Sequence, residues 1–483
     1  MIRKSVTIHS SLLFDPKKKA FVKSVSIRVD LQSGSIVDVY ERASDDEIRD
    51  GDIDLRGKVV MPGLVDAHTH IFLHPYGERI STEQFRDESI IERTVRATNH
   101  VRDALLAGYT TYRDLGSEAM ENYDANLRDC INRGLIPGPR LFVATHALAS
   151  PAGYEIRSES RNQHGLVLPA ASDDDDGPWG VRRAVRRRAG AGADVIKFYA
   201  DYRKRVMRFP PLHPAVIGKE KAGAGIRFPP DHGEINPAVP LYTQEEMNAI
   251  VEEAKAEGMA VAAHSGTVAG ALMAVRAGVT SLEHGQMLSE EVVAEMATRG
   301  TIYVPTLTVM EMGLPKKEYK EAQARLMAAY SKGVRLAAGG DTGTFPHGEN
   351  AREVELMMEA GVKVEDALEA CMVGGWEACG KELSGFRFGF FEKGARADVI
   401  ALETDPREDP RALRKVSFVM KDGEMYKSDG VASPSDDDAC ERLGGRGPSQ
   451  AKARGVVHES RAEDGGLGWA RSRWSIGPFA RPS

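Results

Sequence analysis

Two histidines at alternate positions are the residues of this chain best placed to do chemistry together. They are His68 and His70, which follow an apolar run and a Pro-Gly turn in the segment VVMPGLVDAHTH. Successive side chains of a β-strand point to opposite faces, so residues two apart point the same way. If the segment is a strand, both imidazoles face one side and can hold the same metal ion. A chance spacing of two histidines is the alternative.

Further candidate ligands stand at the ends of four short runs of small or β-branched residues. They are Lys197, His264, His284 and Asp341. Helix-like segments that close on glycine, Gln244–Gly258 and Val268–Gly278, lie between such runs. The repeated βα pattern predicts an α/β protein with a parallel sheet. Chemical groups at the C-terminal ends of several different strands are typical of a (β/α)8 TIM barrel.

The order of these motifs resembles the metal-dependent amidohydrolase superfamily. The resemblance covers roughly residues 1–428 and rests on the segments PGLVDAHTH, VIKFYADYR, SLEHG and AAGGDTG. All six ligand positions of the binuclear, lysine-bearing type are present. Within the superfamily, the chain is similar to the branch of imidazolonepropionase-like amidohydrolases, lysine-type prolidases and fungal ochratoxin-hydrolysing amidases.

Imidazole and carboxylate groups suit zinc, whereas a lysine ammonium repels a cation. Burial lowers the pKa of a lysine, which can then be neutral. The resemblance implies that Lys197 carries a carbamate that bridges two divalent metal ions, expected to be Zn²⁺. It assigns His68, His70 and Asp341 to the first ion, and His264 and His284 to the second. Asp341 is then also the catalytic residue that takes a proton and passes it to the leaving nitrogen.

Substrate contacts can be predicted for residues near these ligands. Tyr199, Tyr202 and Arg203 follow Lys197 and can meet an anionic or aromatic group, since a guanidinium suits a carboxylate. Ordinary loop packing is the alternative for these three. His146 ends the run Leu141–His146 and is a second catalytic candidate, which would polarise the scissile carbonyl. His347, in the loop after Asp341, is a substrate-binding candidate at the pocket rim.

A mononuclear deaminase is a competing interpretation of the same histidines. Such enzymes lack the bridging lysine and carry a glutamate three residues after the third histidine. Here that position is Thr267. Deamination is therefore disfavoured.

The chain ends predict a second, smaller domain. Alternating strand-like runs occur within 22–39 and again within 397–423. We predict a composite β-sandwich from residues 1–57 plus 385–428, and a barrel from residues 58–384. The insert 205–240 is rich in Pro, Gly and Lys and is expected to form a lid or to stay mobile. The tail 429–483 has little apolar periodicity and is expected to be disordered.

The composition of the chain excludes some classes of binding partner. The chain has 483 residues, 42% of them hydrophobic and 28% charged, and a net charge of −7, so a global basic field for nucleic acid is absent. The arginine-rich run 182–188 is expected to be the solvated face of a helix. No segment is apolar enough to span a membrane and no secretory signal is recognisable, so we expect a cytoplasmic protein. Four cysteines without a CxxC pair indicate free thiols.

These observations predict a binuclear zinc hydrolase with a small-molecule substrate; a homo-oligomer is left open. The expected reaction is cleavage of the amide of an N-acyl amino acid, dipeptide or similar carboxylate-bearing compound by a hydroxide that bridges the metals. Hydrolysis of a cyclic amide, as in imidazolonepropionase-like members, is one alternative. A non-catalytic barrel scaffold is the other.

Overall fold

The computed structural model describes residues 4–44, 48–151, 153, 158–159, 166–167, 170–203 and 238–433. These residues belong to one structural unit, Met1–Asp436. Most of the predicted insert 205–240 and of the predicted tail 429–483 lies outside the described residues, so both predictions stay predictions. None of the helices in the described ranges combines the length and apolar character of a membrane span.

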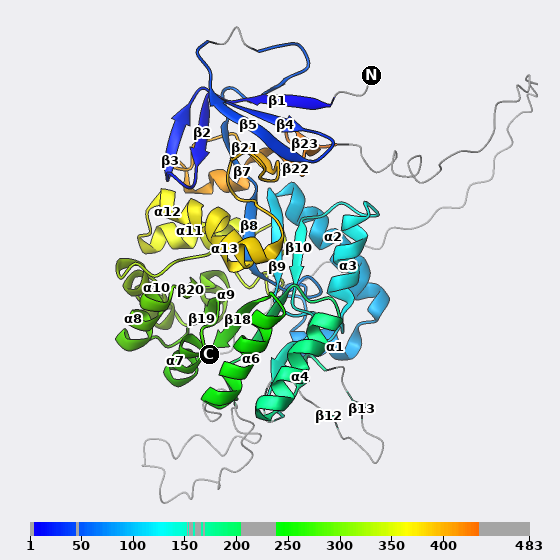
Figure 1. Ribbon diagram of the computed structural model, residues 1–483, viewed down its shortest axis with the longest axis vertical. Coiled ribbons are helices and arrows are strands. Elements are labelled where there is room, and N and C mark those ends of the chain that lie inside the picture. The colour runs from blue at the N-terminus through cyan, green and yellow to red at the C-terminus, as the bar shows by residue number, and fades with distance from the viewer. Residues whose placement is uncertain are drawn as a thin grey trace, which may run out of the picture. The chain divides into compact units, whose positions relative to one another are not determined.

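Parallel strands form the centre of the fold (Figure 1). One sheet has the order β10-β9-β8 and another the order β14-β11-β15-β18-β19-β20, and every pairing within them is parallel. The strands are β8 (Leu64–Thr69), β9 (Tyr109–Asp114), β10 (Arg140–Val143), β11 (Ala147–Ala149), β14 (Ser172–Asp174), β15 (Val195–Tyr199), β18 (Ala260–Ser265), β19 (Ser281–His284) and β20 (Ile302–Val304).

Backbone hydrogen bonds continue beyond these named strands. Val143 of β10 accepts a bond from Asp194, the residue before β15, at 2.8 Å. At the other edge, Leu336 forms a parallel bridge with Tyr303 of β20. The amide of Ala67 in β8 donates to Ala338 at 2.9 Å. The segment 334–341 therefore bonds to both β20 and β8.

Helices separate most of the parallel strands in sequence, as the βα pattern predicts. They are α1 (Ser81–Asp87), α2 (Ile90–Leu106), α3 (Tyr123–Asn132), α4 (Gly177–Gly190), α6 (Gln244–Ala256), α7 (Val268–Ala277), α8 (Glu290–Arg299), α9 (Leu307–Gly313), α10 (Lys316–Ser331), α11 (Ala351–Ala360), α12 (Val364–Glu369) and α13 (Gly375–Ala378). Short helical turns η2 (Ala370–Gly374), η3 (Lys381–Ser384) and η4 (Pro410–Arg414) complete the set. The two helices predicted between ligand-bearing runs are confirmed as α6 and α7.

Local sequence explains where these two helices begin and end. Thr243 and Glu246 form a reciprocal capping box that satisfies free amides at the start of α6. The side chain of Thr267 caps α7, which stops at Gly278 in the left-handed conformation with φ 89°. Thr267 thus has a structural task at the position where a deaminase would carry its glutamate.

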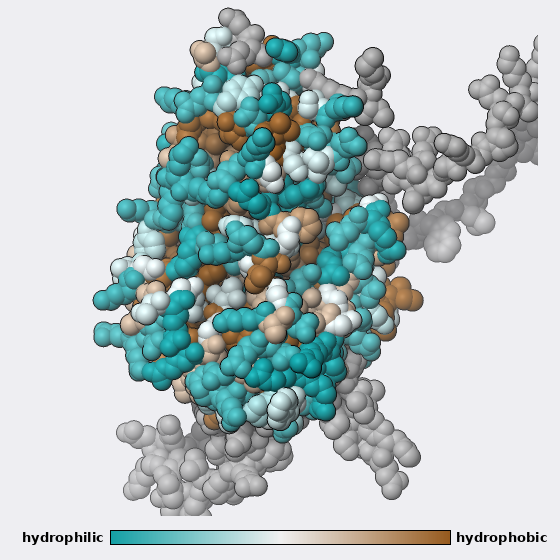
Figure 2. All heavy atoms as spheres, viewed as in Figure 1, coloured by the Kyte–Doolittle hydropathy of each residue, from teal (hydrophilic) through white to brown (hydrophobic). Residues whose placement is uncertain are grey.

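The arginine-rich run lies on α4 and forms ion pairs. Arg182 and Arg186 pair with Glu252 and Glu253 of the neighbouring helix α6. Figure 2 shows mostly hydrophilic residues over the part of the face where α4 and α6 lie. Because the charges are compensated within the protein, the run is a solvated helix face, as predicted.

Two antiparallel sheets contain the chain ends. The first has the order β5-β4-β1-β6, and the second has the order β24-β23-β22-β21-β7-β2-β3 and joins strands from both ends of the described chain. Buried residues of both sheets, among them Ile27 and Phe418, belong to one hydrophobic cluster. The strands are β1 (Ser5–His9), β2 (Leu12–Asp15), β3 (Ala20–Lys23), β4 (Val25–Asp30), β5 (Ser35–Glu41), β6 (Ile53–Asp54), β7 (Val59–Pro62), β21 (Val399–Leu402), β22 (Val416–Lys421), β23 (Glu424–Ser428) and β24 (Val431–Ala432).

Two short antiparallel pairs complete the strands, β12 (Ser158–Glu159) with β13 (Leu166–Val167), and β16 (Asp201–Arg203) with β17 (Ala238–Pro240). Three of the four cysteines, Cys130, Cys371 and Cys379, are free thiols, as predicted. Cys440 lies outside the described residues.

Candidate active site

The predicted ligands converge where the parallel strands end. The His68 and His284 rings lie 4.8 Å apart, and the His264 and His284 rings 4.6 Å apart, between centroids. Oδ1 of Asp341 lies 3.2 Å from Nε2 of His70 and 3.6 Å from Nε2 of His68. His68, His284 and Asp341 each place one donor atom within 4.8 Å of the others.

Lys197 belongs to the same group. It is 2% exposed on β15, and its Nζ lies 5.9 Å from the ring of Tyr199, which itself contacts His264 at 5.0 Å between centroids. On β15, Phe198 packs in the large core cluster with α4 and α6 residues, so the alternate residues Lys197 and Tyr199 face the other side. The structure therefore brings all six predicted ligands to one region.

The glycine-rich segment before and after Asp341 allows a close backbone approach. Amides of Asp341 and Thr342 both donate to the carbonyl of His68 at 3.1 Å. A Cβ at Gly339 would lie 2.6 Å from the backbone nitrogen of His68, and one at Gly343, whose φ is 118°, would lie 2.5 Å from the carbonyl of His70. Only glycine fits these two positions, which explains the motif GGDTG.

Hydrogen bonds orient three of the imidazoles. Nδ1 of His68 donates to the Glu283 carboxylate at 2.9 Å, and Nδ1 of His70 donates to the carbonyl of Gly116 at 3.1 Å. Nδ1 of His284 bonds with the hydroxyl of Thr306 at 2.9 Å. Such bonds fix ring orientation and leave Nε2 for a metal, as is usual for metal-binding histidines.

Glu283 is a site residue that the sequence analysis missed. It is fully buried and accepts bonds from His68, from Arg113 at 2.8 Å and from Ser281 at 2.5 Å. Strand alternation would put Glu283 and His284 on opposite faces, but His284 has a left-handed φ of 65° and both side chains contact His68. A charged residue inside the otherwise apolar run before His284 was the available signal.

The electrostatics favour neutral imidazoles at most of these positions. Burial lowers the pKa of His68 to about 4 and that of His284 to about 3, and it lowers the pKa of His264 well below its usual value. Burial also lowers the pKa of His70, but the hydrogen bond to Asp341 and the charge of Glu118 outweigh it and raise the value to about 9. Neutral imidazole is the form that binds metal ions.

The pKa values of Lys197 and Asp341, the two remaining candidate ligands, are also shifted in the direction that favours metal binding. Burial lowers the pKa of Lys197 to about 8. Burial raises the pKa of Asp341, but His68 and His70 hold it well below its usual range, so the group is a carboxylate. Imidazole nitrogens with one carboxylate are a donor set that fits zinc. The residues present therefore fit a metal site.

Aromatic residues line one side of the cluster. Tyr199 and Tyr202 both contact His264, with ring centroids at 5.0 and 5.5 Å. The backbone of Arg203 lies in β16, but its side chain is outside the described part of the structure. Tyr76, which the sequence analysis also missed, is tied by its amide to Thr344 at 3.0 Å. Burial, then the carboxylates of Glu118 and Asp341, raise the pKa of Tyr76.

Asp201 fixes the turn that follows His264. Its carboxylate accepts bonds from the amides of Gly266 at 2.7 Å and Thr267 at 3.1 Å, and from the hydroxyl of Ser265 at 3.1 Å. A Cβ at Gly270 would overlap this carboxylate. The segment after Lys197 thus positions the next ligand-bearing loop.

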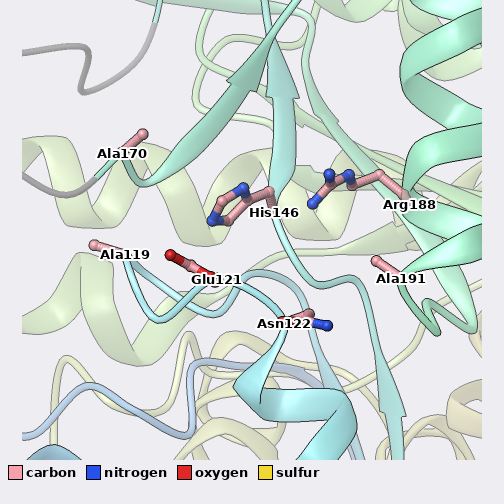
Figure 3. A pocket seen from close by; sticks show the side chains of 7 residues that line it. All are labelled: Ala119, Glu121, Asn122, His146, Ala170, Arg188 and Ala191. Atoms are coloured by element: carbon pink, nitrogen blue, oxygen red, sulfur yellow. The ribbon is translucent and has the colours of Figure 1, made fainter. Parts of the chain in front are cut away.

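His146 is not brought into this cluster. Leu148 of β11 pairs with Phe198, and both pack in the core cluster of the outer, helix-covered face. His146 directly precedes β11, in a bend after Thr145, whose φ is a left-handed 59°. Its ring lies in a separate pocket beside Arg188 (Figure 3). This geometry gives no support to a contact with the substrate carbonyl, which remains a prediction.

His347 lies close to the cluster but is packed. It is 7% exposed, its Nε2 donates to the carbonyl of Leu73 at 3.3 Å, and its ring stacks on His100 at 4.3 Å between centroids. The structure places it inside the loop layer and not at an open rim. A role in substrate binding remains a prediction.

Comparison with known proteins agrees with this site. The sequence profile of the amidohydrolase family matches residues 59–426. Ochratoxinase from Aspergillus niger is 29% identical over 405 residues, which are 79% of this chain and 78% of that protein. Imidazolonepropionase from Symbiobacterium thermophilum is 26% identical over 367 residues, covering 73% of this chain and 76% of that protein.

Solved structures give the same result. The crystal structure of A. niger ochratoxinase has a TM-score of 0.70 at 27% identity and covers 89% of this chain and 97% of that one. A Xaa-Pro dipeptidase with methionine bound in its active site has a TM-score of 0.69 at 28% identity, covering 88% of this chain and all of that one. From the profile match over most of its length, we conclude that the chain belongs to the amidohydrolase family.

Proposed function

We propose that this hydrolase of carbon–nitrogen bonds is a binuclear metal-dependent amidase for carboxylate-bearing substrates. The observation that carries the proposal is the convergence of four imidazoles, one lysine and one carboxylate at the strand ends, with Nδ1 of three rings already engaged by protein acceptors or a hydroxyl. A scaffold protein has no need for this orientation. Two relatives similar over most of their length are named ochratoxinase and Xaa-Pro dipeptidase, and a dipeptide carries a free carboxylate.

The ligands divide between two metal ions. His68, His70 and Asp341 would hold the first ion, and His264 and His284 the second. Lys197 lies on β15, next to β18 and one strand away from β19, and would bridge both ions as a carbamate. The close grouping of His68, His284 and Asp341, which come from both ligand sets, supports two neighbouring ions.

Carbamate formation needs an amine that is neutral for part of the time. Nζ of Lys197 would attack the carbon of carbon dioxide, lose a proton to solvent and become an anionic group with two oxygen donors. A lysine whose pKa is lowered to about 8 by burial meets this requirement far better than an exposed lysine.

Zinc ions, when bound, supply Lewis acidity to the amide carbonyl and lower the pKa of an attacking water. The chain's own contribution is then proton transfer by Asp341. Its carboxylate would accept the proton of that water and donate it to the leaving nitrogen, as general base and then general acid. The backbone bonds from residues 341 and 342 to His68 hold this carboxylate in place.

Tyr199, Tyr202 and Arg203 are the proposed substrate-binding residues. The two tyrosines already flank His264, and the Arg203 guanidinium suits a carboxylate. We expect Arg203→Met to raise KM for a carboxylate-bearing amide far more than for the matching neutral amide. Equal effects on both substrates, measured by steady-state kinetics at unchanged metal content, would assign Arg203 to loop structure.

The strands that carry these residues also support a proposal about the fold. We infer that β8, β9, β10, β15, β18, β19, β20 and the segment 334–341 close into a (β/α)8 barrel over residues 58–384. The bonds from Asp194 to Val143 and from Ala67 to Ala338 support closure. The shared cluster of the two antiparallel sheets supports a β-sandwich from residues 1–57 plus 385–428.

The decisive experiment replaces the bridging lysine. We expect Lys197→Ala to lose most bound zinc and nearly all activity on a panel of N-acyl amino acids and dipeptides, with partial rescue by a short carboxylic acid plus zinc. Lys421→Ala is the matched control, because Lys421 is also a buried strand lysine but lies in the terminal sheet. Full zinc content and activity in Lys197→Ala would overturn the binuclear proposal.

The proton-transfer role has a separate test. Asp341→Asn keeps an oxygen donor but cannot carry a proton at neutral pH, so kcat should fall by several orders of magnitude while circular dichroism stays unchanged. A variant with wild-type kcat would show that another group moves the proton.

A further inference from the structure

A pocket next to the candidate active site is lined by none of the predicted metal ligands. It has a volume of about 390 Å³, within the range of sites for small molecules. It is bounded by the loop before α3, the residue before β11 and the C-terminal end of α4. Its lining residues are Ala119, Glu121, Asn122, His146, Ala170, Arg188 and Ala191 (Figure 3).

His146 brings an unsatisfied polar atom to this pocket. Its Nε2 is buried and has no hydrogen-bond partner among the described residues. A buried polar atom without a partner is unfavourable, so a ligand group that bonds with it removes that cost. Burial, then the charge of Arg188, lower the pKa of His146, so the ring is neutral and can donate one hydrogen bond.

Arg188 brings a positive charge that is only partly compensated. Its Nε lies 3.1 Å from Oδ2 of Asp173, but that carboxylate already receives two hydrogen bonds from Arg187. Within the described ranges, Nε of Arg188 has no hydrogen bond of acceptable geometry. Figure 3 shows the Arg188 side chain pointing toward the His146 ring. A carboxylate placed between these two groups would receive a charge-assisted bond.

Glu121 brings a negative charge on the other side of the His146 ring (Figure 3). Its backbone is held firmly, because its carbonyl accepts a bond from the hydroxyl of Ser117 at 2.5 Å, and the amide of Ser117 donates to Thr145 at 2.8 Å. Glu121 has a left-handed φ of 47°, which few residues of this type adopt without a constraint. The pocket thus has an anionic side chain and a cationic side chain on opposite sides of the His146 ring (Figure 3).

We propose that this pocket is a second ligand site that binds a small zwitterionic α-amino acid. Arg188 and His146 would receive the carboxylate, and Glu121 would receive the ammonium group. The alanines at 119, 170 and 191 leave room for a side chain. The proposal does not depend on the proposed amidase function, since none of these residues belongs to the predicted ligand set.

The two sites share a wall. Glu118 lies 3.4 Å from Nδ1 of His70, whereas the next residue, Ala119, lines the pocket, and both have a left-handed φ. Binding at the pocket must therefore be separated experimentally from binding at the candidate active site.

The test is calorimetric titration of the zinc-loaded full chain with L-phenylalanine. Phenylacetate and phenethylamine, each lacking one of the two charges, serve as ligand controls and should bind at least tenfold more weakly. We expect saturable binding that persists in Lys197→Ala and weakens at least tenfold in Arg188→Met. Arg183→Met is the matched control, because Arg183 is 70% exposed on the same helix and pairs with Asp175; it should bind like the unchanged chain.

Two further variants, Ala191→Leu and Glu121→Gln, test the proposal even if Arg188→Met does not fold. The first should fill the pocket and abolish binding, and the second should weaken it at least tenfold while thermal unfolding stays unchanged. Binding that is lost in Lys197→Ala but kept in Arg188→Met would place the amino acid at the candidate active site and overturn the proposal. Absence of binding, or equal binding of the singly charged analogues, would also overturn it.

Discussion

Two networks of buried arginine–carboxylate ion pairs in this protein are similar in composition but connect to different parts of the molecule. In one, Arg113 of β9 pairs with Glu283 at 2.8 Å, 170 residues further along the chain. In the other, Arg140 of β10 pairs with Asp398 at 2.8 Å, 258 residues further along. Both arginines also donate to a strand hydroxyl, Ser281 and Thr111 respectively. Only the first network continues to a candidate metal ligand, His68.

The comparison shows that similar buried ion pairs can orient a side chain of the candidate site or can join two parts of the fold. A buried ion pair is weak evidence for stability, because removing two charges from water offsets most of their attraction. The network of Arg113 sets the orientation of the ring of His68, a candidate metal ligand. The network of Arg140 continues to Asp422, which also bonds with Arg396, and joins β10 to the terminal sheet. The same chemistry thus serves a candidate site in one place and a junction in the other.

The largest effect is expected from Glu283→Gln. The change removes the carboxylate that His68 donates to and leaves Arg113 buried without its anion. We expect zinc affinity to fall about 10- to 100-fold and unfolding free energy to fall by about 3–5 kcal/mol. Competition with a chromophoric chelator and chemical denaturation measure the two effects. Unchanged zinc affinity would mean that the network does not prepare the ligand.

Asp398→Asn is the matched change in the other network and should affect only stability. Arg140 would lose one of its two carboxylate partners and keep Asp422, so the unfolding free energy should fall by at most about 3–5 kcal/mol. Zinc content and kcat of the folded variant should stay unchanged, because Asp398 contacts none of the predicted ligands. Loss of zinc at a temperature where the variant is folded would contradict the division between the two networks.

Sequence was sufficient to propose the candidate ligands but not the residues that support them. His68, His264 and Asp341 could be identified because each has the right chemistry at the end of a recognisable apolar run. Glu283 could not be assigned, since its partner Arg113 is 170 residues away. The left-handed backbone of His284, which brings neighbouring residues to one side, is also not readable from a strand pattern.

For the fold, too, features set by nearby residues could be predicted from the sequence, and features set by distant residues could not. The helices α6 and α7 follow from caps and glycines that act within a few residues. Pairing between the two chain ends in one sheet was predicted from matching strand runs, and its register depends on tertiary packing. His146 was predicted to contact the substrate because it ends an apolar run, and that role stays a prediction; its neighbour Thr145 has a left-handed φ of 59°, and the His146 ring lines a pocket beside Arg188.

A smaller effect is expected when only the hydroxyl of the first network is removed. Ser281→Ala deletes a donor to Glu283 and an acceptor for Arg113 but leaves the ion pair intact. We expect a loss of about 1–3 kcal/mol in unfolding free energy with a weaker, measurable decrease in zinc affinity. Thr111→Val is the matched control in the Arg140 network and should cost similar stability at unchanged zinc affinity. Equal zinc affinities in both variants would limit ligand preparation to Glu283 itself.

The smallest effect is expected for an arginine–carboxylate ion pair at the protein surface. Arg182 of α4 lies 2.5 Å from Glu252 of α6, but the Glu252 side chain is 64% exposed. Water and salt screen such a pair, so Glu252→Gln should change the unfolding free energy by about 0–1 kcal/mol, and less in high salt. Chemical denaturation at two salt concentrations measures this. A loss as large as that of Asp398→Asn would show that helix contact geometry, and not burial, determines what these arginine–carboxylate pairs contribute, and the comparison between the two buried networks would then lose its physical basis.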